Sequence, residues 1–316
     1  MRILITGASG FLGSWICRVL SANHEVIALL RKDSDQIRLK GISNLTILDS
    51  DDWSASIKRG SPDAIVINDW WGVGNQFRND EAQVDNLPRF TRTVESAIEA
   101  KVPIIIGVGS QAELGPVSGT IYEDRLDNPT TKYGQAKSKA RTILFDKCIN
   151  SESRAVWFRV FSTYGALDSG GWLITDTIKN LMKNKEMLLT PGGQIWSYLH
   201  AYDLANSLNY IISNSNLKGI VNIGNPNVLK IKDVALQIGN ILGKPELIKL
   251  GSVPYRDDQV MELKPACEKL TKAGWAPEIS LEAGLQHTID WFKGENSLLK
   301  LNNKKEIDLK LPLIVG

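Results

Sequence analysis

The chain has 316 residues, 43% hydrophobic and 23% charged, with a formal net charge of only +2 at pH 7. This composition excludes a disordered chain and predicts one large globular domain or two unequal ones. The 37 basic and 35 acidic residues leave no excess of positive charge, so we expect no nucleic-acid partner. Apolar runs stay far below the roughly 20 residues that cross a bilayer, which predicts no membrane span.

The cysteines and the amino terminus point to a cytoplasmic protein. Cys17, Cys148 and Cys267 are far apart in the sequence and form no CxxC pattern. We therefore expect buried, reduced thiols and neither a disulfide nor a metal site. The first residues read as a strand followed by a glycine turn, which leaves no room for the apolar region of a signal peptide.

Short β-branched runs alternate with segments of helical period, a pattern typical of βαβ units on a parallel sheet. The predicted strands are Arg2–Thr6, Glu25–Leu30, Leu45–Leu48, Ala64–Asn68, Pro103–Gly107, Arg154–Arg159 and Gly219–Gly224. The predicted helices are Phe11–Ser21, Asn86–Ala100, Lys132–Asn150, Trp172–Asn184, Ile231–Leu242 and Leu281–Phe292. The fold expected is α/β, a Rossmann-like, doubly wound parallel sheet with a smaller, interleaved C-terminal lobe.

The division into lobes follows a change of character after Tyr164-Gly165, where loops and isolated helices replace the alternating pattern. We expect residues 1–165, joined by 200–225, to form the dinucleotide-binding domain. Residues 166–199 and 226–293 would form the substrate-binding lobe, and 294–316 a tail. The tail ends in the apolar run Leu311–Val315, which either docks on the body or a partner subunit or frays.

A glycine-rich turn joins the first strand to the first helix in the segment Gly7-Ala8-Ser9-Gly10-Phe11-Leu12-Gly13. Glycine there lets the backbone turn tightly and approach a pyrophosphate, while the helix N-terminus offers unpaired N–H groups. The segment therefore predicts a dinucleotide site, with contacts from Gly7, Ser9, Gly10, Phe11, Leu12 and Gly13.

The end of the second strand distinguishes the two nicotinamide dinucleotides. An acidic residue there suits the ribose hydroxyls of NAD, whereas a cation suits the 2′-phosphate of NADP. Here Arg31 and Lys32 follow the strand, which favours NADP. Alternatively the two cations form a solvated loop, and Asp51 or Asp52 contacts the adenine end of either cofactor.

The candidate catalytic group combines a hydroxyl at a strand end with a tyrosine and a lysine on one helix. Tyr133 and Lys137 are four residues apart and so share a helix face. Ser110 comes just after a predicted strand, at the sheet edge where ligands bind in such folds. A cation near the phenol would make Tyr133 a better acid–base group.

In this order, the glycine turn, Ser110, Tyr133 and Lys137 resemble the extended short-chain dehydrogenases/reductases, the nucleotide-sugar epimerase/dehydratase family. The resemblance runs from residue 1 to about residue 293 and includes Asn86, 159–165, 197–205 and 272–277. It implies that Tyr133 protonates the substrate oxygen, that Ser110 hydrogen-bonds it and that Lys137 also holds the nicotinamide ribose. A nucleotide-sugar substrate, with Asn86 and Gln111 among its contacts, and a homodimer are implied as well.

The residues after Ser110 indicate which reaction of this family to expect. Gln111 and Ala112 stand where the dehydratases carry an Asp-Glu pair, and we interpret Glu113 as a loop acid, so dehydration is disfavoured. With NADP, the prediction is reduction of the 4-keto group of a nucleotide-linked 6-deoxyhexose in deoxysugar or surface-polysaccharide biosynthesis. The alternatives are a C4 epimerase and, in another class, a non-catalytic NADP-binding regulator.

Two departures from the family pattern concern the substrate. Trp196 stands where relatives carry a phosphate-binding arginine, so we expect Arg256 to supply the cation and Trp196 to stack on the base or ribose. An ion pair of Arg256 with Asp257 or Asp258 is the alternative. Trp70 and Trp71 follow the fourth strand of the sheet, where they either stack on a ligand or pack between strand and helix.

Overall fold

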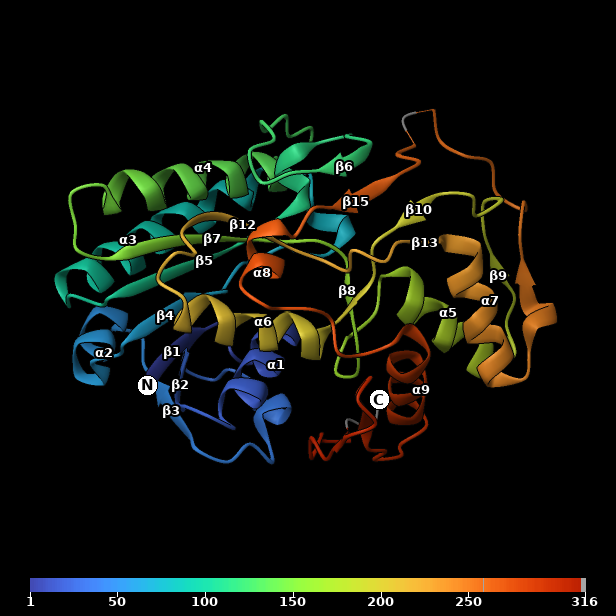
Figure 1. Cartoon of the computed structure of the whole chain (residues 1–316), viewed down its shortest axis with the longest axis horizontal. Helices are drawn as coiled ribbons and strands as arrows, with labels where there is room; N and C mark the ends of the chain where they lie inside the picture. Colours follow the sequence, from blue (N-terminus) through green and yellow to red (C-terminus); the bar gives the residue numbers. More distant parts are fainter. Residues whose placement is uncertain (258, 314–316) are drawn as a thin grey trace.

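In the computed structural model a seven-stranded parallel sheet occupies the centre, in the order β12-β7-β5-β4-β1-β2-β3 (Figure 1). The structure describes residues 1–257 and 259–313, so Asp258 and the end of the apolar tail lie outside the described residues. The strands are β1 (Arg2–Thr6), β2 (Glu25–Leu30), β3 (Leu45–Asp49), β4 (Ala64–Ile67), β5 (Ile104–Ser110), β7 (Arg154–Val160) and β12 (Gly219–Ile223). The strand order reverses between β1 and β4, which places a ligand crevice at their carboxyl ends.

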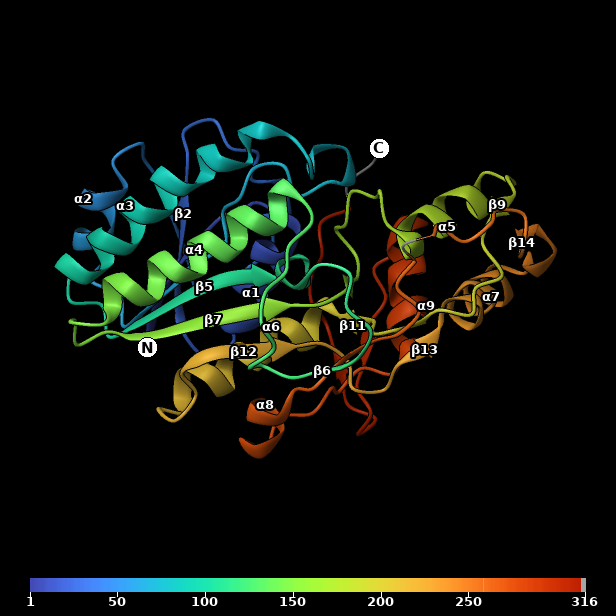
Figure 2. The same cartoon turned by 90° about the horizontal axis from the view of Figure 1, so that it is seen from above.

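Helices cover both faces of the sheet, as Figure 2 shows from above. On one face lie α2 (Trp53–Gly60), α3 (Asn86–Glu99) and α4 (Lys132–Cys148); on the other lie α1 (Phe11–Leu20) and α6 (Ala201–Ser213). Each face has its own buried apolar cluster, since alternate side chains of a strand point to opposite faces. The predicted doubly wound α/β fold is confirmed.

The observed elements differ from the predicted ones at the end of strand β5 and at helix α2. Strand β5 runs to Ser110, three residues beyond the predicted end, because its last residues still pair with β7 up to Val160. Helix α2 was not predicted; Asp52 caps it by accepting a hydrogen bond from the Ala55 amide at 3.0 Å.

A second lobe packs around helices α5 (Leu173–Met182), α7 (Ile231–Leu242) and α9 (Leu281–Phe292), which enclose an apolar cluster of their own. In Figure 1 it lies to the right of the sheet. The chain leaves the sheet after β7 and returns with α6 and β12. The remaining short elements are β6 (Gly119–Ile121), β8 (Thr163–Tyr164), β9 (Met187–Leu188), β10 (Ile195–Trp196), β11 (Leu199–His200), β13 (Leu229–Lys230), β14 (Ile248–Lys249), β15 (Leu263–Pro265), β16 (Leu299–Lys300), β17 (Glu306–Ile307), α8 (Glu268–Lys272), η1 (Ile37–Leu39), η2 (Asn75–Phe77), η3 (Glu81–Asp85), η4 (Gln111–Leu114) and η5 (Pro245–Leu247).

The tail docks on the body as far as it is described. Leu309 and Leu311 are buried in the cluster on the α1 face, and the buried Arg18 guanidinium donates to the Leu309 oxygen at 2.8 Å. Docking is therefore confirmed for Leu309 to Pro312, whereas the Leu313 side chain is exposed. The three cysteines are buried and unpaired, as predicted. Among the described helices, none has the length and apolar character to cross a membrane.

Candidate functional site

The glycine turn joins β1 to α1, and its glycines allow close packing of the backbone. Gly7 has a φ of +63°, and a Cβ there would meet the Asp69 backbone at 2.8 Å. A Cβ on Gly13 would lie 2.1 Å from the Gly7 oxygen, so only glycine lets α1 pack this closely. Gly10 precedes the first turn of α1 and has no side chain to cap it, which leaves the amides of the first turn available to an anion.

The cations beyond β2 are at the surface. Arg31 and Lys32 are exposed, and the Lys32 ammonium lies 3.4 Å from an Asp51 carboxylate oxygen. The predicted cofactor contacts Lys32 and Asp51 therefore lie together at the end of the sheet's second strand. Both side chains are about two-thirds exposed, so this pair costs little to rearrange around a ligand.

Ser110 and Tyr133 meet at the carboxyl edge of the sheet. Tyr133 lies in the first turn of α4 and is buried, which raises the pKa of its phenol, while a hydrogen bond with the Ser110 side chain lowers it. The Ser110 oxygen also accepts a hydrogen bond from the Ala112 amide at 3.2 Å, so the residue caps η4 as well. The hydroxyl is thus fixed beside the phenol.

Lys137 lies one turn beyond Tyr133, with its ammonium 6.0 Å from the Tyr133 ring centroid. It donates to the Val108 oxygen at 2.8 Å and faces the Trp70 ring at 3.9 Å. Burial lowers the pKa of Lys137 to about 7. Trp70 thus packs against Tyr133 and Lys137, and its indole donates to Gln83 at 2.9 Å.

Glu113 is a buried ion-pair partner, so its interpretation as a simple loop acid was wrong. Its side chain is fully buried and accepts hydrogen bonds from the Ser110 amide at 2.6 Å and the Trp157 indole at 2.9 Å. It also pairs with Arg159 at 3.2 Å, and Arg159 in turn contacts Asp127. The Glu113 carboxylate therefore fixes the backbone of Ser110 through the hydrogen bond from its amide. The Ser-x-x-Glu spacing of a capping box was the signal that sequence reasoning could have used.

The segment after β4 covers Tyr133 and contains a residue that the sequence analysis did not find. The Arg78 guanidinium lies over the Tyr133 ring, with its carbon 5.2 Å from the ring centroid. Asn86 anchors this segment by accepting from the Trp71 amide at 2.8 Å and donating to the Gln83 oxygen at 3.1 Å. A substrate contact of Asn86 stays a prediction. The sequence carried no signal for Arg78.

The other predicted substrate residues lie on three different segments of the chain. Gln111 follows Ser110 directly, and its buried Oε1 has no hydrogen-bond partner among the described residues. Trp196, half-buried on β10, packs against an apolar cluster and donates to the Ser162 hydroxyl at 2.7 Å. Arg256 is exposed in a loop of the second lobe. The roles of all three stay predictions.

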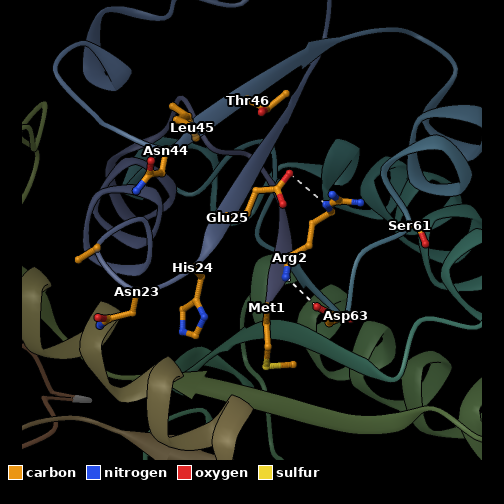
Figure 3. Close-up of a pocket in the computed structure, with 11 residues that line it drawn as sticks. Met1, Arg2, Asn23, His24, Glu25, Asn44, Leu45, Thr46, Ser61 and Asp63 are labelled. Carbon is orange, nitrogen blue, oxygen red and sulfur yellow. Dashed lines mark hydrogen bonds and ion pairs between the residues drawn. The ribbon is translucent and has the colours of Figure 1, made fainter.

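A wide surface hollow of about 770 Å³ lies at the opposite, amino-terminal edge of the sheet (Figure 3). Its lining includes Arg2, His24, Glu25 and Asp63. The Arg2 guanidinium pairs with Glu25 at 3.1 Å, and the Arg2 backbone amide donates to Asp63 at 2.7 Å. The hollow therefore does not coincide with the group formed by Ser110, Tyr133 and Lys137. Within the described ranges, no cluster of His, Cys, Asp and Glu could hold a metal ion.

Comparison with known proteins identifies relatives over nearly the whole chain. The sequence model of the NAD dependent epimerase/dehydratase family matches residues 3–224. An uncharacterized protein of Methanocaldococcus jannaschii is 24% identical over 325 aligned positions, covering 95% of this chain and 99% of its own length.

Solved structures share the fold at low sequence identity. The UDP-N-acetylglucosamine 4-epimerase of Methanobrevibacter ruminantium, in complex with UDP-N-acetylmuramic acid, superposes with a TM-score of 0.83 at 17% identity, covering 93% of this chain and 98% of its own. The dTDP-glucose 4,6-dehydratase of Bacillus anthracis, in complex with NAD, gives a TM-score of 0.80 at 20% identity, with 93% and 97% covered. Both show the same architecture.

Proposed function

The chain belongs to the NAD dependent epimerase/dehydratase family, and we propose that it catalyses the NADPH-dependent reduction of the 4-keto group of a nucleotide-linked 6-deoxyhexose. The observation that carries this proposal is the end of β2, where Arg31 and Lys32 replace the acid that suits NAD. A reductase consumes an exchangeable cofactor, and NADPH is the usual reductant of biosynthesis.

The residues at the crevice fit such a cofactor. The turn at Gly7 and the uncapped first turn of α1 suit its pyrophosphate, and Arg31 suits its 2′-phosphate. Lys137 would hold the nicotinamide ribose. When bound, NADPH would supply the hydride. We assign residues 1–165 and 200–225 to cofactor binding, and 166–199 and 226–293 to the substrate.

Residues of the chain would supply the proton that the reduced carbonyl oxygen needs. Tyr133 would donate its phenolic proton to the oxygen of the carbonyl being reduced, and Ser110 would hydrogen-bond the same oxygen. The hydrogen bond between the Ser110 and Tyr133 side chains supports this assignment, since it brings the two groups together. Lys137 would assist by its positive charge.

The environment of Glu113 disfavours a dehydratase activity. Elimination needs an acid and a base beyond the tyrosine, and Gln111 and Ala112 cannot exchange protons in that way. Glu113 follows them, but its two oxygens are taken by the Ser110 amide, the Trp157 indole and Arg159 inside the protein. A carboxylate held in this way is unsuited to proton transfer on a sugar.

A C4 epimerase of nucleotide hexoses is the second candidate. It is supported by the solved 4-epimerases that share the fold, including the enzyme of Methanobrevibacter ruminantium. An epimerase would keep NAD bound and regenerate it, so it would not oxidise NADPH. A non-catalytic NADP-binding regulator would bind NADPH and turn over neither substrate.

The deciding experiment follows absorbance at 340 nm with NADPH and a nucleotide-linked 4-keto-6-deoxyhexose, prepared with a 4,6-dehydratase. Stoichiometric NADPH oxidation, with loss of the keto group by mass spectrometry, is expected. Tyr133→Phe protein serves as the control. A parallel assay supplies NAD and a nucleotide-linked hexose with a C4 hydroxyl. Interconversion of its C4 epimers, with no NADPH oxidation in the first assay, would replace the reductase by the epimerase, and NADPH binding without either reaction would point to the regulator.

A further inference from the structure

Arg78 is fixed against Tyr133 through both its backbone and its side chain. Its peptide oxygen accepts a hydrogen bond from the Tyr133 amide at 2.9 Å, and its guanidinium carbon lies 5.2 Å from the Tyr133 ring centroid. Trp172 of the second lobe faces the same guanidinium at 5.4 Å. The cation is therefore held between two aromatic rings, one of which carries the proposed acid.

The charge of Arg78 is not neutralised within the described ranges 1–257 and 259–313. No carboxylate there forms an ion pair with it, and its buried Nε has no hydrogen-bond partner. Because no carboxylate in these ranges pairs with it, the positive charge of this guanidinium influences the ionisation of neighbouring groups. Since a nearby cation favours the charged form of an acid, Arg78 lowers the pKa of the Tyr133 phenol.

Other groups face Tyr133 from the elements packed around it. Lys137 lies on the same helix, Ser110 ends β5, and Glu113 lies on η4. The negative charge of Glu113 disfavours the phenolate, and the Ser110 hydrogen bond favours it. The Lys137 ammonium has other partners, the Val108 oxygen and the Trp70 ring.

Lys137 and Arg78 also differ in how they keep their charge. Because burial lowers the pKa of Lys137 to about 7, its ammonium discharges as the pH rises above neutrality. A guanidinium stays protonated throughout this range. Arg78 is consequently the cation beside Tyr133 whose charge does not depend on pH.

We propose that Arg78 is a positioning residue for Tyr133: the guanidinium, held by Trp172, stabilises the phenolate that remains after Tyr133 has given its proton to the substrate oxygen. In that step the phenolic O–H bond breaks and an O–H bond forms on the substrate, and the phenolate then regains a proton from solvent. The inference rests on the proposed function for the reaction, but the contact itself exists without substrate.

The test replaces Tyr133 by 3,5-difluorotyrosine, whose more acidic phenol ionises at lower pH, and follows its ¹⁹F resonance during a pH titration of the ligand-free protein. Arg78→Met should raise the pKa of this phenol by about 1 unit or more. Arg78→Lys keeps a charge and should raise it less. The matched control is Arg92→Met on the exposed side of α3, for which we expect a change below about 0.3 unit.

Activity gives a second, independent readout. In the unlabelled enzyme, Arg78→Met should lower kcat about tenfold or more and leave NADPH affinity unchanged. Thermal unfolding confirms that each variant is folded. An unshifted ¹⁹F titration, or a rise in KM alone, would overturn the role of Arg78. A shifted titration in a protein that reduces no 4-keto sugar would overturn the proposed function instead and leave the Arg78 assignment standing.

Discussion

Glu113→Ala should destabilise the protein strongly, because it removes the centre of a buried network. The carboxylate accepts hydrogen bonds from the Ser110 amide and the Trp157 indole and pairs with Arg159, which is itself fully buried. Removing one member of a buried ion pair costs about 3–5 kcal/mol because the other charge is left uncompensated. Asp127 still contacts Arg159 at 3.2 Å, so we expect the lower end, about 3 kcal/mol.

Guanidinium chloride unfolding, followed by both circular dichroism and tryptophan fluorescence, measures this loss. The matched control is Glu95→Ala, since Glu95 pairs with Lys147 at 2.6 Å on the surface and should cost at most about 1 kcal/mol. Glu113→Gln keeps an oxygen for the Ser110 amide but turns an NH₂ group towards other donors, so it should also destabilise. If Glu113→Ala loses no more stability than Glu95→Ala, the network is not the support described above.

Three further predictions concern ligands and chemistry. Purified protein should bind NADPH at least about tenfold more tightly than NADH, and Arg31→Ala should abolish the difference; equal affinities in a fluorescence titration would contradict the NADP assignment. Tyr133→Phe should keep NADPH binding and slow turnover by about 10²–10⁴-fold, whereas near-normal steady-state rates would move the acid elsewhere. Arg256→Ala should raise KM for the nucleotide sugar at least about tenfold without changing NADPH affinity, and an unchanged KM would remove Arg256 from the site.

The parts of the site that follow a strand end or share a helix face could be predicted from the sequence. Gly7 and Gly13 are separated by the spacing that a turn into a helix requires, and the structure places them at the junction of β1 and α1, as predicted. Tyr133 and Lys137 are one helical turn apart and both are buried at the sheet edge. These features depend on local backbone geometry, which the sequence pattern carries directly.

The rest depends on contacts between distant segments. Arg78 meets Trp172 only because the loop after β4 packs against the start of the second lobe. Glu113 becomes a buried acid because Trp157 and Arg159, more than 40 residues later, lie beside it on β7. No periodicity or spacing around Arg78 or Arg159 indicates such a pairing. Side-chain environments of this kind follow from the packing of loops and strand neighbours.

Lys137 provides a prediction about pH that tests this packing directly. Burial lowers its pKa from the ordinary 10.5 to about 7, against the attraction of Glu113 and Asp69. Between these two values the unfolded chain binds a proton that the folded protein does not. The free energy of unfolding should therefore rise with pH across this window. Below the window, the destabilisation caused by burying the charged Lys137 ammonium should be constant.

The variant Lys137→Met lacks this contribution, so the difference between the two proteins isolates it. From about pH 7 to about pH 9, wild-type protein should gain stability relative to Lys137→Met by up to about 1.4 kcal/mol per pH unit. Chemical unfolding at several pH values measures this slope. Parallel profiles for the two proteins would show that Lys137 keeps its charge well above neutrality. Lys137 would then share with Arg78 the stabilisation of the Tyr133 phenolate, and Arg78 would no longer be distinguished by a charge independent of pH.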